Sequence, residues 1–384
     1  MIVERPALER RVTAVLEAGR IPVVLGGCGT GRSSLLLRLA ASRAGAQYLD
    51  MAAAATTPER CLDAVLAASR FASGNAPDGL SARAAFDALL DHFDAARAPD
   101  GGPATFLLDD FVDIRTFESF PGLRQVQRDL VTRLAASPSH FVLASRFTTR
   151  VHRLLRDAPA RFEVVHVPAL DAQEVEAMAL AVDGARREWA SDVAGPVTAL
   201  TDGRAAAVAE LLSTLASSGP ASDPIAALAA LFSPGGTGAA RCRESYEFRL
   251  HRARGYGALK AILGVLADVE PLSLTEVAHH LRRTPGSTKD YLSWLEDVDL
   301  ITVHAKRYAY DDPLLRLYVR LYGRATPPSD VDIVREVGRY AKTRLTTAPA
   351  STPPPPTPVS PPASAPAPAS VPAEVGRTGI IEID

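Results

Sequence analysis

The glycine-rich segment at residues 26–33, Gly-Gly-Cys-Gly-Thr-Gly-Arg-Ser, constrains the fold more than any other part of the sequence. An apolar run precedes it at residues 21–25, and residues 34–39 follow with leucines at helical spacing. A strand, a glycine loop and a helix in this order form a phosphate-binding loop. The glycines let backbone N–H groups point at a polyphosphate, and the helix N-terminus adds a favourable dipole. Ser33 is placed to put its hydroxyl on Mg²⁺. The residues expected to contact the nucleotide are Gly26, Gly27, Cys28, Gly29, Thr30, Gly31, Arg32, Ser33 and Ser34.

One residue departs from the usual loop pattern, because Arg32 stands where a lysine is expected. Lysine is a compact point charge, whereas the guanidinium of arginine is a wide planar fork, so the exchange is not conservative at a close-packed phosphate site. The chain is rich in arginine, which offers a neutral explanation. However, the first lysine of the chain is Lys260, so no lysine of the nucleotide domain can replace the missing one. We therefore expect ATP to bind with Mg²⁺ and to be hydrolysed slowly.

Two further apolar runs end in polar residues. Residues 105–111, Thr-Phe-Leu-Leu-Asp-Asp-Phe, predict a strand that lies beside the loop strand with its carboxyl end facing the ligand. Asp109 would then hold Mg²⁺ through a water molecule, and Asp110 would orient or deprotonate the attacking water. Taken alone, this pattern also fits a buried strand followed by a solvated turn. Residues 140–144 end in Ser145 and Arg146. Arg146 is either a sensor of the terminal phosphate or an ordinary surface arginine.

Length and composition limit the classes of protein to which the chain can belong. With 384 residues, of which 47% are hydrophobic, the chain is long enough for two or three domains with substantial cores. A net charge of −2 argues against a protein that coats nucleic acid. Its three cysteines have neither metal-ligand spacing nor the number for a disulfide framework. Neither a membrane span nor a signal peptide is predicted, so we expect a cytoplasmic protein without a membrane partner.

The first part of the chain predicts an α/β domain. Five strand-like runs alternate with helical patterns, which indicates a parallel sheet with right-handed crossovers over residues 1–168. The runs lie at residues 21–25, 47–51, 105–108, 141–144 and 163–167. A helical lid and connection is expected over residues 169–240, where Asp171 and Glu174 have the spacing of a capping box.

Residues 241–325 have the pattern of a winged helix-turn-helix. Helices are expected at 256–267, 274–281 and 286–298, followed by two short strands at 300–303 and 308–310. The third helix carries Lys289 but also three acids, Asp290, Glu296 and Asp297, and this balance suits a DNA backbone poorly. We therefore favour protein packing over DNA binding, although Arg282, Arg283, Lys306 and Arg307 leave contacts with a DNA backbone open.

The amino-acid composition changes towards the C-terminal end of the sequence. A further helix is expected over residues 326–344. Residues 345–373 carry no charged side chain and consist mainly of Pro, Ala, Ser and Thr, which predicts a disordered, semi-rigid linker. Residues 374–384 then carry three isoleucines among acids, an unusual composition for an idle tail. We expect this peptide to bind a protein partner, with an idle terminus as the alternative.

Over roughly residues 1–325 the chain resembles the archaeal-type P-loop ATPases, close to the STAND and origin-recognition branches of the AAA+ superfamily. The resemblance rests on the order of the motifs above and on three further segments. These are Val-Glu-Arg-Pro-Ala-Leu at 3–8, Leu-Thr-Asp-Gly-Arg at 200–204 and Asp-Pro-Leu-Leu-Arg-Leu-Tyr at 312–318. It implies that Arg5 helps to seat the adenine, that the protein alternates between ADP-bound and ATP-bound states, and that copies of it assemble. Arg32, and Asp110 where the family usually has glutamate, depart from the pattern.

These observations support three hypotheses for the function. The leading one is an ATP-dependent switch with slow hydrolysis that repositions the winged helix. The second is a DNA-binding regulator or DNA-transaction factor that uses the winged helix. The third is a catalytically inert scaffold that holds nucleotide and recruits partners through its C-terminal peptide.

Overall fold

The computed structural model describes residues 5–71, 79–182, 184–218, 223–250, 255–324 and 326–347. Its contacts divide the chain into one unit over residues 1–347 and a second over residues 348–384. The first unit is described below. Val3 and Glu4 of the N-terminal motif, most of the predicted linker and the whole C-terminal peptide lie outside the described residues.

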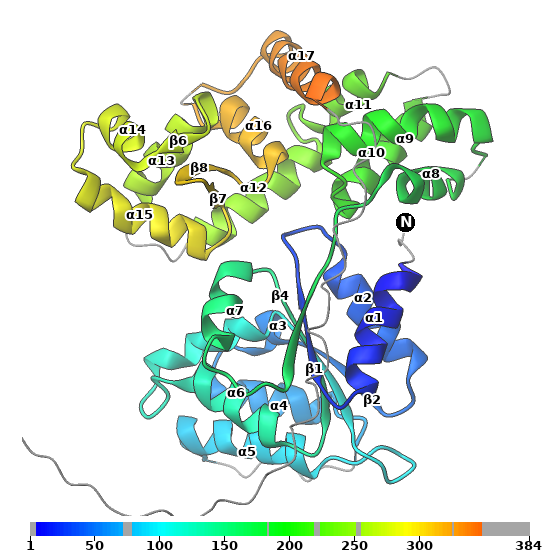
Figure 1. The fold of residues 1–384 in the computed structure, drawn as a ribbon, viewed down its shortest axis with the longest axis vertical. Helices are drawn as coiled ribbons and strands as arrows, with labels where there is room; N and C mark the ends of the chain where they lie inside the picture. The colour runs from blue at the N-terminus through cyan, green and yellow to red at the C-terminus, as the bar shows by residue number, and fades with distance from the viewer. Residues whose placement is uncertain are drawn as a thin grey trace, which may run out of the picture. The chain divides into compact units, whose positions relative to one another are not determined.

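A parallel five-stranded sheet forms the base of the nucleotide domain (Figure 1). Each strand lies within about a residue of its predicted position: β1 Ile21–Leu25, β2 Ala46–Asp50, β3 Thr105–Asp109, β4 His140–Ser145 and β5 Phe162–His166. The helices of this domain are α1 Pro6–Glu17, α2 Arg32–Ser42, α3 Met51–Ala54, α4 Pro58–Ala67, α5 Ala82–Ala95, the 3₁₀ helix η1 Phe111–Ser119, α6 Val126–Ala136 and α7 Thr148–Leu155. The predicted α/β class is confirmed.

The strand order corrects one expectation from the sequence. The order is β2-β3-β4-β1-β5, so β3 pairs with β2 and β4 and does not lie beside the loop strand β1. Instead β4 lies between them, with Val23 of β1 opposite Leu143. Right-handed crossovers allow strands that are close in sequence to be separated in the sheet, and a single sequence carries no local signal for that choice. The prediction that β3 is adjacent to β1 was therefore wrong.

Alternating residues of the strands pack into two separate cores. Val24, Leu107 and Val142 face α1 and α2, where Leu8, Val12 and leucines of α2 complete one cluster. The residues between them, including Val23, Phe106 and Phe141, face the larger core on the opposite side, to which α4, α5 and α6 contribute. A parallel sheet covered on both faces has near-continuous apolar strands, which is why β1 and β3 are buried at all five positions.

The next segment is helical, as expected, with α8 Ala172–Leu180, α9 Arg187–Thr201, α10 Ala205–Ser218, α11 Pro224–Leu231 and α12 Thr237–Leu250. Asp171 and Glu174 form the predicted capping box at the start of α8. Helix α9 ends where Asp202 adopts a left-handed conformation, within the segment Leu-Thr-Asp-Gly-Arg at 200–204. Helix α12 runs continuously across the predicted boundary between residues 240 and 241.

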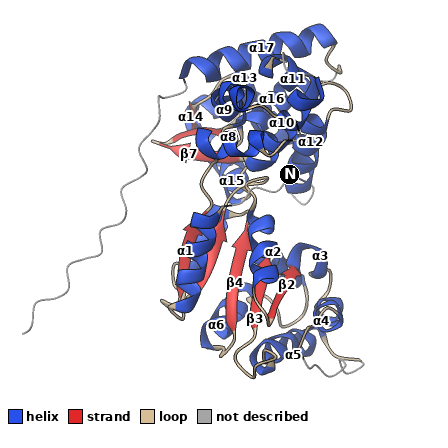
Figure 2. Ribbon diagram, turned by 90° about the vertical axis from the view of Figure 1, so that its right-hand side faces the viewer, coloured by secondary structure: helices blue, strands red, loops and turns tan. Residues whose placement is uncertain are grey.

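The C-terminal module, residues 256–322, contains the elements that the sequence predicts for this region. They are α13 Tyr256–Asp268, α14 Leu274–His280, α15 Pro285–Asp297, β7 Ile301–His304 and β8 Arg307–Tyr310. A helix that was not predicted, α16 Pro313–Tyr322, follows them. A short strand that was not predicted, β6 Leu272–Ser273, extends the hairpin to a three-stranded sheet separate from the parallel one (Figure 2). Ser273 and Glu276, which have the same spacing in the sequence as Asp171 and Glu174, form another capping box.

The last described helix, α17 Asp330–Thr347, extends three residues into the segment predicted as a linker. It packs beside α9, α11 and α16, and the Tyr340 hydroxyl donates a hydrogen bond to the Leu200 carbonyl over 2.7 Å. None of the helices in the described ranges is both long and apolar enough to cross a membrane.

Candidate functional site

The glycine loop connects β1 to α2 and leaves the first turn of α2 open. Gly29 and Gly31 have φ angles of 75° and 92°, which only glycine adopts without strain. The Thr30 hydroxyl holds the turn by donating to the Gly27 carbonyl over 3.0 Å. Among the described residues no side chain caps α2, so its first N–H groups and its dipole face the loop. This geometry is suited to an anion.

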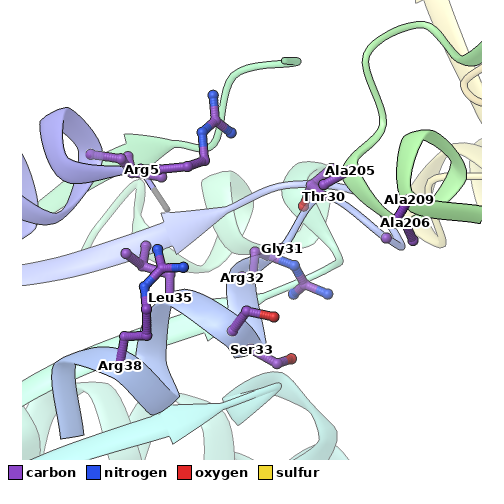
Figure 3. Close-up of a pocket in the computed structure, with 13 residues that line it drawn as sticks. Arg5, Thr30, Gly31, Arg32, Ser33, Leu35, Arg38, Ala205, Ala206 and Ala209 are labelled. Carbon is purple, nitrogen blue, oxygen red and sulfur yellow. The ribbon is translucent and has the colours of Figure 1, made fainter. Parts of the chain in front are cut away.

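A cavity of about 300 Å³ opens beside the loop (Figure 3). Residues 29–35 line one side of it, Arg5 and Leu8 line another, and Ala205, Ala206 and Ala209 of α10 close it. The Ala206 N–H donates to the Gly29 carbonyl over 2.8 Å, so the lid helix is attached directly to the loop. Gly26, Gly27 and Cys28, also predicted to contact nucleotide, do not line this cavity. Gly26 faces Thr30 and Val167, and the surroundings of Gly27 and Cys28 are described below.

Arg32 is buried, and its side chain contacts Asp110, the residue that follows β3. Its Nη1 lies 3.2 Å from Asp110 Oδ1, and Figure 3 shows its guanidinium directed away from Arg5 and Arg38. Arg146 Nη2 lies 2.9 Å from Asp110 Oδ2 and 2.9 Å from Asp113 Oδ2. Both carboxylate oxygens of Asp110 are therefore held by arginines. The structure brings together three of the predicted site residues, although β3 and β1 are not adjacent.

Asp110 and Asp113 differ in their environments. Asp110 has a φ of 48°, a left-handed conformation that aspartate adopts more readily than most residues. For Asp113, burial raises the pKa of the carboxyl, and the neighbouring charge of Asp110 raises it further, while Arg146 and Arg115 lower it; the net shift is upward. The left-handed backbone of Asp110 is strained, and such strain concentrates at functional sites, where the surrounding structure enforces it.

Asp109, the first acid of the pair, is almost fully buried. The Tyr48 hydroxyl donates to its Oδ2 over 3.0 Å, and the Asp110 N–H donates to its Oδ1 over 3.0 Å. Burial, followed by the charge of Asp109, raises the pKa of Tyr48, so the phenol stays protonated and donates. Each carboxylate oxygen keeps a lone pair free for a further donor. Ser33 is exposed and lines the cavity. A hydroxyl and a carboxylate are oxygen ligands of the kind that Mg²⁺ takes.

Arg5 attaches the start of α1 to the segment that leads into the lid. Its Nη1 donates to the Pro168 carbonyl over 2.6 Å, and its Nε lies 3.2 Å from Glu174 Oε1. Because Glu174 also completes the capping box of α8, one arginine links the cavity wall to the first lid helix. Arg5 lines the cavity as the resemblance implies, while the role in seating adenine stays a prediction.

Arg204, to which the sequence analysis gave no role, reaches the loop from the turn before α10. A methyl group built on Gly27 would lie 2.9 Å from Arg204 Nη1 and 3.5 Å from Asp311 Oδ2. Arg204 Nη2 donates to the Asp311 carbonyl over 2.6 Å and lies 3.0 Å from Asp311 Oδ2. An arginine of the lid and an acid of the C-terminal module therefore lie directly against the phosphate loop. The only signal in the sequence is an arginine immediately after the lid turn.

Arg249, in the last turn of α12, is the second residue that the sequence analysis missed. Its Nη2 lies 3.0 Å from Cys28 Sγ, 221 positions away in the sequence, and its Nη1 donates to the Asp299 carbonyl over 2.6 Å. Burial raises the pKa of the Cys28 thiol, but Arg249, a Ser245 hydrogen bond and Arg146 lower it more, so the net shift is downward. No local motif marks such a distant contact.

Four arginines around the loop share one property. Each has a buried Nε atom that makes no hydrogen bond within the described part of the chain: Arg32, Arg146, Arg204 and Arg249. The Nε of Arg204 lies 3.6 Å from Asp312 Oδ1, which is an ion pair and not a hydrogen bond. A buried donor without a partner costs free energy, so such groups mark places where a ligand or water completes the structure. Four of them around a glycine loop and an open helix N-terminus fit an anionic ligand with several oxygens.

Comparison with known proteins identifies the fold. No family model and no curated protein matches the chain. Among solved structures, the Walker-type ATPase PABY2304 of Pyrococcus abyssi has a TM-score of 0.64 at 17% identity, covering 83% of this chain and 96% of that chain. The ORC1 protein of Aeropyrum pernix in complex with DNA gives 0.45 at 15% identity, covering 88% and 93%. Drosophila ORC bound to DNA gives 0.37 at 12% identity, covering 83% and 98%. The chain has the fold of a Walker-type P-loop ATPase.

Proposed function

We propose that this chain is an ATP-dependent switch that hydrolyses its nucleotide slowly and couples the nucleotide state to the C-terminal module, acting as a winged helix. The observation that carries the proposal is the group of four arginines at the glycine loop whose buried Nε atoms make no hydrogen bond among the described residues. ATP supplies several anionic oxygens and an adenine, and the cavity between the loop, Arg5 and α10 has room beside the phosphates.

Different residues of the site would hold different parts of the bound nucleotide. The N–H groups at the start of α2 would hold the phosphates, and Ser33 with Asp109 would hold Mg²⁺, which neutralises phosphate charge when bound. Arg146 lies at the carboxyl end of β4, between the loop strand and the acid pair, where it would stabilise charge on the terminal phosphate. Arg5 would complete the wall at the adenine end of the cavity.

Slow hydrolysis is supported by the contacts that the Asp110 carboxylate makes with arginines. A general base or water-orienting carboxylate needs a free oxygen directed at the water. Here Oδ1 of Asp110 has two donors, Arg32 Nη1 at 3.2 Å and the Arg146 N–H at 3.3 Å, and Arg146 Nη2 lies 2.9 Å from Oδ2. This arrangement favours a long-lived bound state, and it leaves the inert scaffold as the limiting case in which turnover is zero.

Coupling to the C-terminal module is supported by Arg204 and Asp311. The carboxylate of Asp311 lies beside the phosphate loop and is paired with Arg204. A phosphate placed on the loop competes for the same guanidinium with more charge and more acceptor oxygens. Binding of ATP would therefore loosen the contact between Arg204 and Asp311 and release the module from the loop.

A thermal-shift and binding series tests the nucleotide proposal. The full chain is titrated with Mg-ATP and Mg-ADP, and Ser33→Ala is compared with Ser42→Ala at the other end of α2. We expect the melting temperature to rise with nucleotide concentration in the wild type and in the Ser42 control. The Ser33 variant should lose the Mg²⁺ dependence of that shift. A wild-type protein with no shift at millimolar Mg-ATP would exclude the proposal.

DNA binding is a less favoured alternative, for a reason seen in the structure. The C-terminal end of α15, the helix that would read DNA in a winged helix, is paired with the nucleotide domain. Arg153 of α7 makes two hydrogen bonds to Asp297, of 3.0 and 2.7 Å. We expect duplex DNA to bind weakly and with the same affinity whether ATP is present or not. Tight binding that weakens steeply with salt would favour the alternative.

A protein partner is proposed for residues 374–384. Ile380, Ile381 and Ile383 have strand propensity and apolar surface, so adding the peptide to a sheet edge of a partner or of a second copy is the proposed mode. The test compares the full chain with a chain ending at residue 374. We expect the truncation to lose either a partner in pull-down or self-association in light scattering, with nucleotide binding unchanged. Identical partners and identical mass would show that the peptide is idle.

A further inference from the structure

We propose that Arg249 is a further ligand of the terminal phosphate, beside Arg146, and that it makes the site distinguish a nucleoside triphosphate from a diphosphate. This inference rests on the proposed nucleotide function and assigns to α12 a role in that site. The loop needs such a cation because Arg32, at the position of the usual lysine, has its Nη1 occupied by Asp110 at 3.2 Å.

The two ends of the site are chemically distinct, and Arg249 lies at the reacting end. Arg5, Leu8 and Arg38 line the cavity on one side of the loop. On the other side, Cys28 is close enough to Arg146 for that arginine to lower the pKa of its thiol, and Arg146 is itself paired with Asp110. The acid pair of β3 marks where the terminal phosphate reacts, so Cys28 and Arg249 lie at the terminal-phosphate end.

The present partners of Arg249 are weak compared with a phosphate. The side chain is only 6% exposed, yet its Nε has no partner among the described residues and its Nη2 is directed at a sulfur atom. Sulfur is a weak acceptor, whereas a phosphate oxygen forms a charge-assisted hydrogen bond that arginine makes in a bidentate geometry. A terminal phosphate beside Cys28 would take both Nη2 and Nε, while Nη1 keeps the Asp299 carbonyl.

This contact would transmit the nucleotide state. Arg249 ends α12, and the Asp299 carbonyl that it holds belongs to the turn between α15 and β7. The carboxylate of Asp299 accepts hydrogen bonds from the Thr148 and Thr149 N–H groups at the start of α7, over 2.5 and 3.4 Å. A shift of Arg249 towards a phosphate would therefore pull on the connection between the C-terminal module and the helix that follows Arg146.

The decisive measurement is the affinity for Mg-ADP and for a slowly hydrolysed triphosphate, Mg-ATPγS, in four full-length proteins. These are the wild type, Arg249→Gln, Arg249→Lys and the control Arg243→Gln, which changes an exposed arginine of the same helix. We expect Arg249→Gln to weaken ATPγS binding roughly tenfold or more while ADP binding changes less than twofold. The lysine variant should fall between, because it keeps the charge without the fork, and the control should match the wild type.

The outcomes separate this inference from the function on which it rests. A wild-type protein that binds neither nucleotide removes the proposed function itself. If both nucleotides bind and the ratio of ATPγS affinity to ADP affinity is unchanged in Arg249→Gln, only the role of Arg249 is overturned. An equal weakening of both affinities is one form of this outcome and is the sign of a purely structural arginine.

Cys28→Ala provides a test that does not depend on the folding of the Arg249 variants. Removing the sulfur frees Nη2 without changing the arginine, so ATPγS binding should tighten relative to ADP. An unchanged or lower ratio in a Cys28→Ala protein with a normal melting temperature would contradict the inference.

Discussion

The ion pair between Arg32 and Asp110 determines how the loop and the acid pair interact. A lysine at this position would reach the phosphates as a single charge, whereas the arginine fork extends sideways to the carboxylate of β3. The pair is buried, so removing one partner leaves an uncompensated charge, while replacing arginine by lysine keeps the charge and shortens the reach. Exchanging arginine for lysine at position 32 therefore changes which groups the side chain can reach, while its charge stays the same.

Arg32→Lys should increase the rate of ATP hydrolysis several-fold, because one oxygen of Asp110 is released and a compact cation is placed at the phosphates. Affinity for Mg-ATP should change little. The measurement is single-turnover phosphate release from the wild type and the variant at saturating nucleotide. Equal or slower release from the lysine variant would mean that arginine is tolerated at this position.

Asp110→Asn sets the baseline for that experiment, since an amide cannot accept a proton from the attacking water. We expect this variant to bind Mg-ATP with nearly unchanged affinity and to release no phosphate above the rate without protein. If phosphate release persists at the wild-type rate, Asp110 is not the residue that acts on the attacking water.

At the scale of elements, the start of α7 is capped by a residue from another part of the chain. Its own N-cap residue, Phe147, supplies no side-chain hydrogen bond, and the carboxylate of Asp299 accepts from the first two N–H groups instead. Arg146 lies in the short link between β4 and α7. A cap of this kind stabilises a helix by about 1 kcal/mol, so α7 and the C-terminal module stabilise each other.

Asp299 should make the stability of the protein fall as the pH rises through the range from about 4 to about 6. Burial, with a contribution from Asp311, raises the pKa of Asp299 to about 6 from 3.8, although Thr148, Arg249 and Thr149 act in the opposite direction. In this window the folded protein holds a proton that the unfolded chain has released, so raising the pH favours unfolding. The effect is on the order of 3 kcal/mol.

The measurement is the free energy of unfolding of the wild type minus that of Asp299→Asn, from urea titrations at several pH values. Asparagine tolerates the left-handed backbone of this position, where φ is 51°, and keeps an oxygen for the α7 cap. We expect the difference to fall between pH 4 and pH 6 and to be flat above pH 7. A difference that stays constant, or that rises with pH, would show that Asp299 titrates in its ordinary range.

The elements that the sequence predicted well are those determined by local chemistry. The strands β1 and β3 are apolar runs, and the capping boxes at Asp171 and Ser273 are local spacings, so each was visible without a structure. The position of β4 between β3 and β1, and the contact of Arg249 with Cys28, depend on how distant segments pack. A single sequence carries no pattern for such choices, which is why the loop residues were predicted but the cations around them were not.

At the scale of the whole unit, residues 5–347, three arginines of the nucleotide domain and the lid contact the C-terminal module, in addition to the hydrogen bonds that Asp299 accepts from the Thr148 and Thr149 N–H groups. Arg204 pairs with Asp311, Arg249 holds the Asp299 carbonyl, and Arg153 pairs with Asp297. The first two lie at the phosphate loop, where a ligand can compete for the arginine. The third is more exposed and distant from the loop residues, so we expect it to be independent of nucleotide.

Asp311→Asn should therefore tighten the binding of Mg-ATP. The carboxylate that competes with phosphate for Arg204 is removed, while the Asp311 carbonyl, 2.6 Å from Arg204 Nη2, keeps the arginine in place. Because the Asp311 side chain is 36% exposed, its pairing is partly screened by solvent, and we expect a gain of roughly two- to fivefold. Asp312 is unsuitable for this test because it caps α16 through the Leu314 and Leu315 N–H groups.

The control is Asp290→Asn, which removes an exposed acid of α15 and changes the net charge by the same amount. Titration with a fluorescent ATP analogue in low and moderate salt compares the two variants with the wild type. A gain in the Asp311 variant alone supports direct competition at Arg204, and it should shrink as salt screens the pair. An equal gain in both variants would assign the effect to overall charge. Weaker binding in the Asp311 variant would mean that its carboxylate belongs to the nucleotide site rather than opposing it.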